Sequence, residues 1–167
     1  LYKSTVWANL VVGDYNPDLV SIAEYKKMMR DAQVRAGFDL ITMGVLMKPW
    51  KIRHPDKEVV SVLTKNLQQL EYPSIRNAMK AMLSALAYGF SVTEVVFEDT
   101  GRYWLVRETN GLKTIDAKYI KFYSDPYGNL QKIEEQLVSM VELPKERCLV
   151  WSHEAKFGNW YGESILN

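Results

Sequence analysis

Residues 83–98 read LSALAYGFSVTEVVFE, and within this stretch the sequence changes from a helical pattern to a strand pattern. Before Gly89, small and apolar residues recur at the spacing of one helical face. Gly89 can end that helix, because glycine readily adopts the left-handed conformation common at helix C-termini. After Gly89, β-branched and aromatic residues are enriched, as in strands. The stretch therefore predicts a chain in which helices come first and a sheet follows.

Upstream, residues 21–47 have the spacing of an amphipathic helix. Its apolar residues recur three or four positions apart: Ile22, Tyr25, Met29, Ala32, Ala36, Leu40, Met43 and Met47. Asp31 can cap a new helical start, so we expect a bend or break near it. Beyond Phe38 the sequence is apolar on most sides, and we expect that half to be buried on several faces. Pro49 ends the helix, because the residue before a proline is disfavoured in the helical conformation.

Two further helices are expected before Gly89. One spans about 56–71, with Asp56 as its cap and apolar residues on one face. The other spans about 73–88, with Pro73 in its first turn, where proline is well tolerated. Residues 21–88 are therefore the expected helical part of the chain.

Downstream of Gly89, the sequence predicts a small, mostly antiparallel sheet over about 90–153. The expected strands are residues 91–97, 102–108, 118–123, 130–136 and 148–153. Short links rich in Asp, Asn, Gly and Pro separate several of them, and such links favour tight turns between antiparallel neighbours. Helices followed by strands define the α+β class.

Composition sets limits on the class of protein. A chain of 167 residues that is 47% hydrophobic can fill the core of about one domain. Its 21 basic and 20 acidic residues nearly cancel, so no strong global field attracts nucleic acid or an anionic membrane. Cys148 is the single cysteine, which excludes an internal disulfide and fits a reducing compartment. No apolar run approaches the roughly 18 residues of a membrane span, and the first residues lack the regions of a signal peptide, so we expect a soluble, intracellular chain.

Glu94 is the clearest local anomaly. Alternation along residues 90–96 places its carboxylate on an otherwise apolar strand face, where it needs a partner or water. A catalytic carboxylate would need a second one within roughly 5 to 10 Å. Glu98 and Asp99 lie farther along, toward the turn. We favour a salt bridge, a hydrogen bond or a subunit contact; an enzyme fragment with Glu94 as acid or base is the alternative.

No other catalytic or metal-binding pattern stands out. His54 and His153 are the only histidines and have no ligand spacing, so a metal site is not expected. Ser152 beside His153 does not suggest a nucleophilic pair, because neighbours on a strand point to opposite faces. The string around Gly162 lacks the ending of a phosphate-binding loop. We therefore expect neither catalysis nor a cofactor.

Aromatic residues are abundant and support two interpretations. Six of them cluster on the expected strands near basic residues: Tyr103, Trp104, Tyr119, Phe122, Tyr123 and Tyr127. A single-stranded nucleic-acid binding module could use such a platform. Strand aromatics are more often core or interface residues, and Trp104, Trp151 and Trp160 are our candidate interface anchors. Residues 48–53 are interpreted as a solvated basic stretch around a buried Trp50, with phosphate contact as the weaker alternative.

Three strings occur in a fixed order: YKKMMRDAQVRAGFDLITMGVLMKPWKI at 25–52, the stretch at 83–98, and GNWYGESIL at 158–166. Together they resemble the tailed-bacteriophage portal protein family, in its Mu-like branch. The residues that match the family pattern are Asp31, Val34, Pro49, Trp50, Tyr88, Gly89, Glu94, Tyr161 and Gly162. The resemblance implies that these are structural residues.

The resemblance also implies a function. Portal proteins form homo-oligomeric rings, usually of twelve subunits, at one capsid vertex of the virion, after assembly in the cytoplasm of the bacterial host. Double-stranded DNA enters and leaves through the ring, which contacts the terminase motor, the capsid and head-tail adaptor proteins. The resemblance implies neither a membrane partner nor a cofactor.

The resemblance assigns the parts of the chain as well. Residues 1–167 would be one α+β wing-like region and a piece of a longer product, without stem and crown. Residues 1–20 would be an N-terminal extension, and residues 158–167 would lead into a further helix.

Overall fold

The structure, a computed structural model, describes residues 21–137, 139–155 and 158–166. The expected extension at 1–20 lies outside these residues. The helices are α2 (Ile22–Met28), α3 (Ala32–Leu46), α4 (Lys57–Gln68), α5 (Ile75–Met82) and α6 (Ala85–Tyr88). The strands that follow them are β1 (Phe90–Val95), β2 (Phe97–Asp99), β3 (Trp104–Val106), β4 (Leu112–Ile115), β5 (Ile120–Ser124), β6 (Leu130–Gln136), β7 (Met140–Leu143) and β8 (Cys148–Ser152). The predicted α+β class is confirmed.

The break expected near Asp31 separates α2 from α3. The Asp31 carboxylate accepts hydrogen bonds from the backbone N–H groups of Gln33 and Val34, which α3 would otherwise leave unpaired. Ser21 and Glu24 form a capping box at the start of α2. Each helix therefore begins at a side chain that satisfies its first free N–H groups.

The helix expected over 73–88 is in fact two helices. Ser74, not Pro73, is the N-cap of α5, and Pro73 precedes the helix. A turn at Leu83 and Ser84 then separates α5 from α6. Gly89 ends α6 in the left-handed conformation, with a φ of 85°, as its position before the strands predicts.

All of the strand pairs are antiparallel. The sheets have the orders β4-β1-β8, β2-β3 and β5-β6-β7. The predicted strand 130–136 has the bounds of β6, whereas the one expected at 91–97 ends at Val95 and continues separately as β2. Two short strands were not predicted, namely β4 and β7. Two 3₁₀ turns, Ala117–Tyr119 and Lys145–Arg147, lead into β5 and β8.

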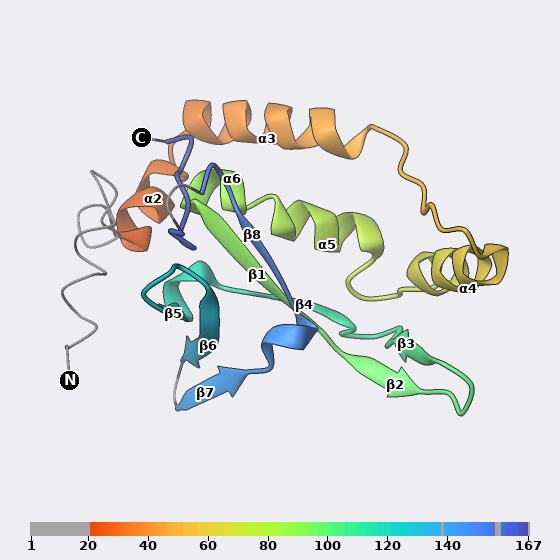
Figure 1. Ribbon diagram of the computed structural model, residues 1–167. Helices are drawn as coiled ribbons and strands as arrows, with labels where there is room; N and C mark the ends of the chain where they lie inside the picture. Colours follow the sequence, from red (N-terminus) through yellow and green to blue (C-terminus); the bar gives the residue numbers. More distant parts are fainter. Residues whose placement is uncertain (1–20, 138, 156–157, 167) are drawn as a thin grey trace.

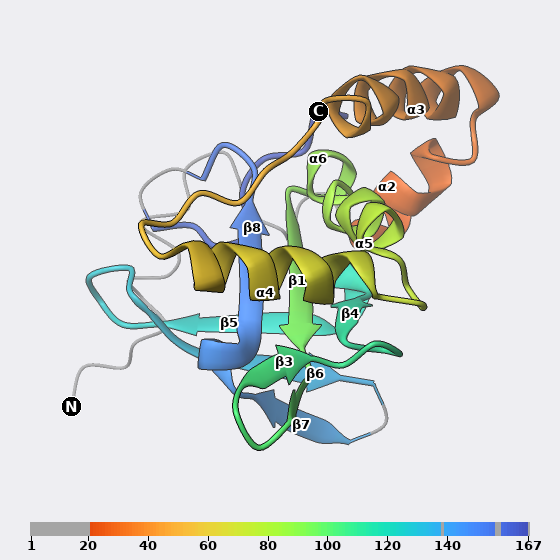
Figure 2. The same ribbon diagram turned by 90° about the vertical axis from the view of Figure 1, so that its right-hand side faces the viewer.

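The sheet β4-β1-β8 lies in the middle of the molecule, with α5 and α6 on one side and β5-β6-β7 on the other (Figures 1 and 2). The main core lies between the two sheets and contains Phe90, Val92, Ile115, Ala117, Ile120, Phe122, Ile133 and Leu143. A smaller core lies under α5 and contains Leu70, Ala78, Val95 and Leu112. Because β1 contributes to both cores, its residues are nearly all buried.

Helix α3 forms an outer layer over α5 (Figure 1). Only Thr42 on this helix is fully buried. Large apolar side chains beyond Phe38 are instead exposed: Leu40, Ile41, Met43, Val45 and Met47. The expectation that this half is buried on several faces is therefore wrong for the single chain, because only one side of α3 meets the rest of the molecule.

The β2-β3 hairpin projects beyond the central sheet (Figure 1) and contacts α4 through β3. The buried side chain of Asn66 on α4 donates a hydrogen bond to the Val106 carbonyl (2.8 Å) and accepts one from the Val106 N–H (3.0 Å). Near the start of α4, the Glu58 carboxylate accepts hydrogen bonds from Arg102 and from the Tyr103 hydroxyl. Helix and hairpin are thus joined at two points.

Candidate functional site

The structure brings together the glycines of the second and third strings. The Gly89 carbonyl accepts a hydrogen bond from the His153 N–H at 2.7 Å. A β-carbon on Gly89 would lie 2.4 Å from the Tyr161 carbonyl oxygen, and one on Gly162 would lie 2.3 Å from the Gly89 carbonyl oxygen. Both positions have positive φ, at 85° and 59°. Only glycine fits such a crossing of two backbones, which we call the glycine crossing.

Tyr161 fixes the glycine crossing to the main core. Its ring packs edge-on against Phe90 and Phe122, with centroids 5.3 and 5.1 Å away. Its hydroxyl accepts a hydrogen bond from the backbone N–H of Phe122 at 3.1 Å. Tyr88, next to Gly89, packs partly buried against the same core, and burial raises the pKa of its phenol. These aromatic residues therefore act as packing residues within the chain.

The C-terminal string runs along α6 after the glycine crossing. The Ser164 hydroxyl donates to the Ala87 carbonyl (2.7 Å), and the Ile165 N–H donates to the Leu86 carbonyl (2.9 Å). The Trp160 indole N–H donates to the Gly128 carbonyl at 2.9 Å. Trp160 is thus half-buried and used within the chain, unlike an exposed interface anchor. Residues 158–166 form turns and loop, so the further helix expected after this string does not begin within them.

Glu94 lies half-buried in the central strand. Lys113 on β4 and Cys148 on β8 are its cross-strand neighbours. Burial, together with the charges of Glu94 and Glu146, raises the pKa of the Cys148 thiol to about 11. Glu94 thus lies between a cation and a thiol that stays protonated, and so is not a nucleophile, at neutral pH.

The aromatic residues considered for nucleic-acid stacking do not form one platform. Tyr103 and Trp104 belong to the β2-β3 hairpin, whereas Phe122 and Tyr123 belong to β5 in another sheet. Phe122 is buried in the core, and Tyr127 lies on the turn after β5. A single-stranded nucleic acid needs successive stacking surfaces along one groove. Because these rings are dispersed or buried, the structure gives no support to that alternative.

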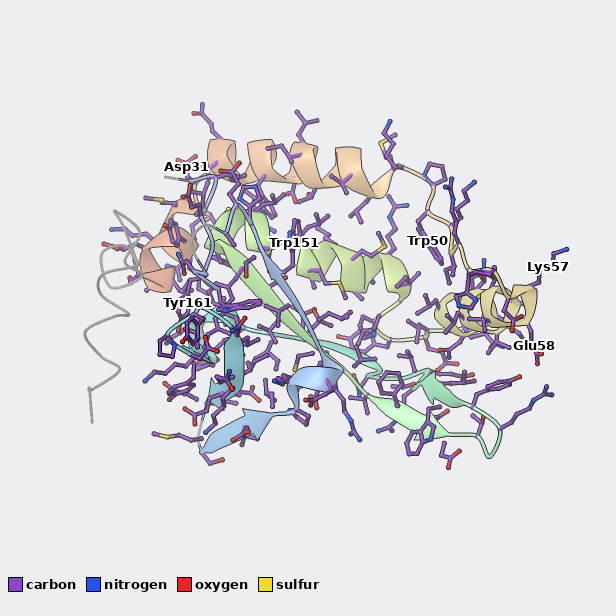
Figure 3. The ribbon with its side chains drawn as sticks, viewed as in Figure 1. Asp31, Trp50, Lys57, Glu58, Trp151 and Tyr161 are labelled. Atoms are coloured by element: carbon purple, nitrogen blue, oxygen red, sulfur yellow. The ribbon has the colours of Figure 1, made fainter. Side chains whose placement is uncertain are left out.

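Pro49 and Trp50 lie on the connection between α3 and α4, where they line a groove (Figure 3). This groove has a volume of about 500 Å³. Its apolar lining comes from Leu46, Met47, Trp50, Ile52, Val60 and Met79. Trp50 is 41% exposed, so the expected burial of this residue is wrong. The groove is therefore an apolar hollow whose wall includes an open tryptophan.

Basic side chains surround the groove. Lys48, Lys51 and Arg76 line it and are exposed. Within residues 21–137, 139–155 and 158–166, these three cations form no salt bridge. An apolar hollow with unpaired cations at its edge suits a ligand or partner that carries apolar and acidic groups together.

Two of the candidate interface tryptophans are exposed. Trp104 on β3 is 66% exposed, and Trp151 on β8 is 38% exposed. Leu149 lies two residues before Trp151, on the same side of this edge strand, and is also exposed. The molecule therefore has open apolar surfaces on α3, on the hairpin and along β8, in contrast to the internal packing of Trp160.

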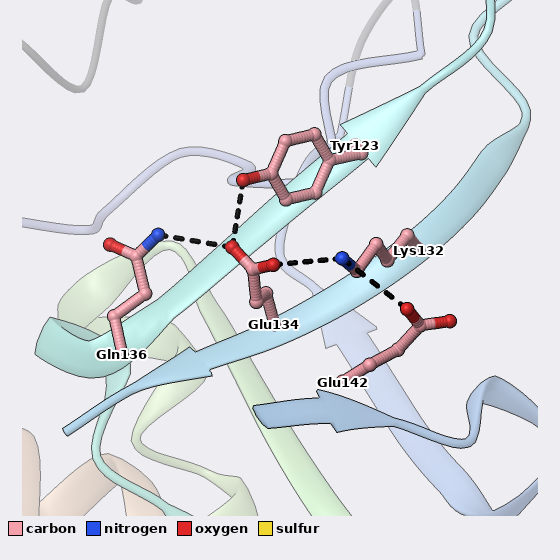
Figure 4. Close-up of polar contacts among 5 residues, drawn as sticks. All are labelled: Tyr123, Lys132, Glu134, Gln136 and Glu142. Atoms are coloured by element: carbon pink, nitrogen blue, oxygen red, sulfur yellow. Dashed lines mark hydrogen bonds and ion pairs between the residues drawn. The ribbon is translucent and has the colours of Figure 1, made fainter. Parts of the chain in front are cut away.

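The sequence did not single out a polar network on the β5-β6-β7 sheet (Figure 4). Buried Glu134 accepts hydrogen bonds from Lys132 (2.8 Å), from the Tyr123 hydroxyl (2.7 Å) and from Gln136 (3.2 Å). These bonds lower the pKa of the Glu134 carboxyl to about 2. Lys132 also pairs with Glu142 at 3.3 Å, and both carboxylates raise the pKa of this lysine. A glutamate in an alternating polar run carries no signal that would reveal such a network.

Two features of other protein classes, a metal-binding cluster and a membrane-spanning helix, are not found among the described residues. No group of three or more His, Cys, Asp and Glu side chains there is placed to hold a metal ion. Among the helices described, none combines the length and apolarity that crossing a bilayer requires.

The sequence was compared with known families and proteins. The family model described as the portal protein of Mu bacteriophage matches residues 22–167. No curated protein matches the chain. Because the family model covers nearly the whole chain, this chain belongs to the Mu-like portal protein family, a family of structural phage proteins.

Proposed function

We propose that this chain is a structural subunit of a phage portal ring, the head-tail connector through which double-stranded DNA is packaged and ejected. The observation that carries the proposal is the match of the Mu portal family model to residues 22–167. The ring would stand at one capsid vertex and contain about twelve copies, with no catalytic role for the chain.

The surfaces of the molecule are consistent with this proposal. A ring subunit needs surfaces for its neighbours more than it needs a reaction pocket, and α3 exposes Leu40, Met43 and Met47 without a partner in the described part of the chain. A helix that is apolar on nearly all sides is normally buried. Capsid, terminase and head-tail adaptor proteins would supply further contacts to the assembled portal. The glycine crossing would fix the C-terminal string to α6 and to the central sheet within a wing-like region of the subunit.

Electron microscopy of the complete gene product tests the proposal. Negatively stained particles of purified protein should appear as rings of about twelve subunits with a central hole. Discrete monomers or dimers under assembly conditions would contradict the proposed function. A second measurement, detection of the chain in purified virions at roughly one ring per particle, tests the location at the portal vertex.

A further inference from the structure

The groove beside α3 and the outer side of α3 form one continuous uncovered surface. Met47 belongs to both, because it lines the groove and is 76% exposed. Leu40, two turns earlier on the helix, is 74% exposed. No charged residue occurs from Leu40 to Met47. Exposure of such an apolar surface to water is unfavourable, so the surface is suited to contact with another apolar surface.

The edge of this surface specifies the charge of its partner. Lys48, Lys51 and Arg76 surround the groove, and none forms a salt bridge with another described residue. An acidic partner would gain from these cations, whereas a basic one would be repelled. The occupant should therefore present apolar side chains with carboxylates beside them.

The β2-β3 hairpin of the same chain has this combination. Trp104 is 66% exposed and Phe97 is 37% exposed. Asp99 lies directly across the ladder from Trp104, so these two side chains share one face of the hairpin. The Asp99 carboxylate forms no salt bridge within the residues that the structure describes. The hairpin thus matches the groove in both apolarity and charge.

A chain cannot place its own hairpin in its own groove in this fold. Helix α4 lies between the hairpin and α3 in both ribbon views (Figures 1 and 2). Asn66 and Glu58 fix the hairpin to α4. Two complementary surfaces on different sides of one molecule give head-to-tail contacts, and repeated head-to-tail contacts form a ring when the rotation closes.

We propose that the groove beside α3 receives the β2-β3 hairpin of a second copy of this chain. Trp104 of that copy packs on the apolar lining, and its Asp99, on the same face of the hairpin, faces Lys48, Lys51 and Arg76. This inference rests on the proposed portal function, because it assigns the contact by which neighbouring subunits of the ring recognise each other.

Disulfide cross-linking of the complete gene product tests the contact. In a Cys148→Ser background, Lys51→Cys and Asp99→Cys are introduced together, and the protein is oxidised and separated without reductant. Each copy would use both cysteines, so a ladder of bands beyond the dimer is expected. Either cysteine alone should stay monomeric. The matched pair Lys51→Cys with Glu142→Cys, an exposed glutamate on β7, should give no ladder.

Charge reversal gives an independent readout. Lys51→Glu and Asp99→Lys should each weaken assembly by about fivefold, because each places like charges opposite one another at the contact. The double variant should recover most of the lost assembly. If either residue had a purely structural role, this recovery would not occur. Both side chains are exposed, so circular dichroism should show an unchanged fold for all three variants.

The outcomes separate this contact from the portal function. If the wild type forms rings but the double-cysteine variant gives no ladder of cross-linked bands, the contact is overturned and the portal function is not. The same holds if the charge-reversal variants assemble like the wild type. Wild-type protein that remains monomeric would overturn the proposed function and the contact together.

Discussion

At the scale of single residues, Gly89 and Gly162 show how the C-terminal string is attached. Each approaches the backbone of the other more closely than a β-carbon allows. The crossing also satisfies the Gly89 carbonyl, which accepts the His153 N–H, and the His153 carbonyl, which accepts the Glu163 N–H at 2.7 Å. Two small residues therefore permit three segments to share backbone hydrogen bonds where side chains would separate them.

Replacement of Gly162 by alanine should strongly destabilise the protein. The new β-carbon would lie 2.3 Å from the Gly89 oxygen and 2.4 Å from the His153 oxygen, so backbone must move. We expect the free energy of unfolding to fall by at least about 2 kcal/mol. The matched control is Gly101→Ala, which also has a positive φ, of 80°, but no atom within 4 Å of its β-carbon. Chemical denaturation should show that this variant loses only about 1 kcal/mol of its free energy of unfolding. Equal losses for both would show that contact at the crossing is unimportant.

The network around Glu134 should make stability depend on pH in the acid range. Hydrogen bonds from Lys132, Tyr123 and Gln136 lower the pKa of this carboxyl from 4.5 to about 2. Because the folded state holds the ionised form, the contribution is complete above pH 4.5 and is lost as pH falls toward 2. Glu134→Gln should therefore lower Tm most at pH 7, with a gap that narrows between pH 4.5 and 2.

Thermal melts of both proteins across this pH range check the effect. Glu142→Gln is the matched control, because Glu142 is exposed and also pairs with Lys132. It should lower Tm less than Glu134→Gln at pH 7. A gap between wild type and Glu134→Gln that stays constant from pH 7 to pH 3 would contradict the assignment of this network.

Single residues differ in how far the sequence predicts them. The left-handed cap at Gly89 and the helix cap at Asp31 were foreseen, because each depends on its immediate neighbours. The contacts of Gly162 were not, since its partner at Gly89 lies far away in the sequence. The internal hydrogen bond of Trp160 was missed for the same reason, as Gly128 lies on a different turn.

At the scale of elements, the long helices and most strands follow from periodicity, and the short strands do not. Strand β4 reads LKTI and β7 reads MVEL, each of four residues. Their strand conformation depends on pairing with β1 and β6, which are separate segments of the chain. Local propensity over four residues is too weak to show such pairing. The apolar composition of the second half of α3 predicted burial, which is wrong for the chain as described, because composition does not show which faces of a helix meet the rest of the fold.

The attachment of the hairpin to α4 should depend on Asn66. This buried side chain satisfies both the N–H and the carbonyl of Val106. In Asn66→Ala both backbone groups lose their partner, so we expect a loss of about 1–3 kcal/mol in the free energy of unfolding. Hydrogen exchange at the Val106 amide should become faster than at β1 amides. The neighbouring exposed Lys65→Ala is the control and should change neither quantity; unchanged exchange in Asn66→Ala would mean that other contacts hold the hairpin.

At the scale of the whole molecule, the buried and open surfaces have separate roles. The two cores and the glycine crossing hold the chain together, whereas α3, the groove and the hairpin contribute little to its own packing. Nearly balanced charge leaves recognition to local groups such as the cations at the groove. Substitutions on the open surfaces should therefore separate assembly from folding.

Leu40→Glu tests this separation. Leu40 is 74% exposed on α3, so the free energy of unfolding of the single chain should change by no more than about 0.5 kcal/mol. In the assembled protein the same change would place a charge in an apolar contact, and rings should be replaced by smaller species in sedimentation velocity and electron microscopy. Leu137→Glu is the matched control, because Leu137 is 56% exposed and directly follows β6, a strand that lies across the central sheet from α3 (Figure 1). Normal rings from Leu137→Glu and none from Leu40→Glu would assign assembly to the α3 surface, whereas normal rings from both would mean that this surface faces solvent in the portal.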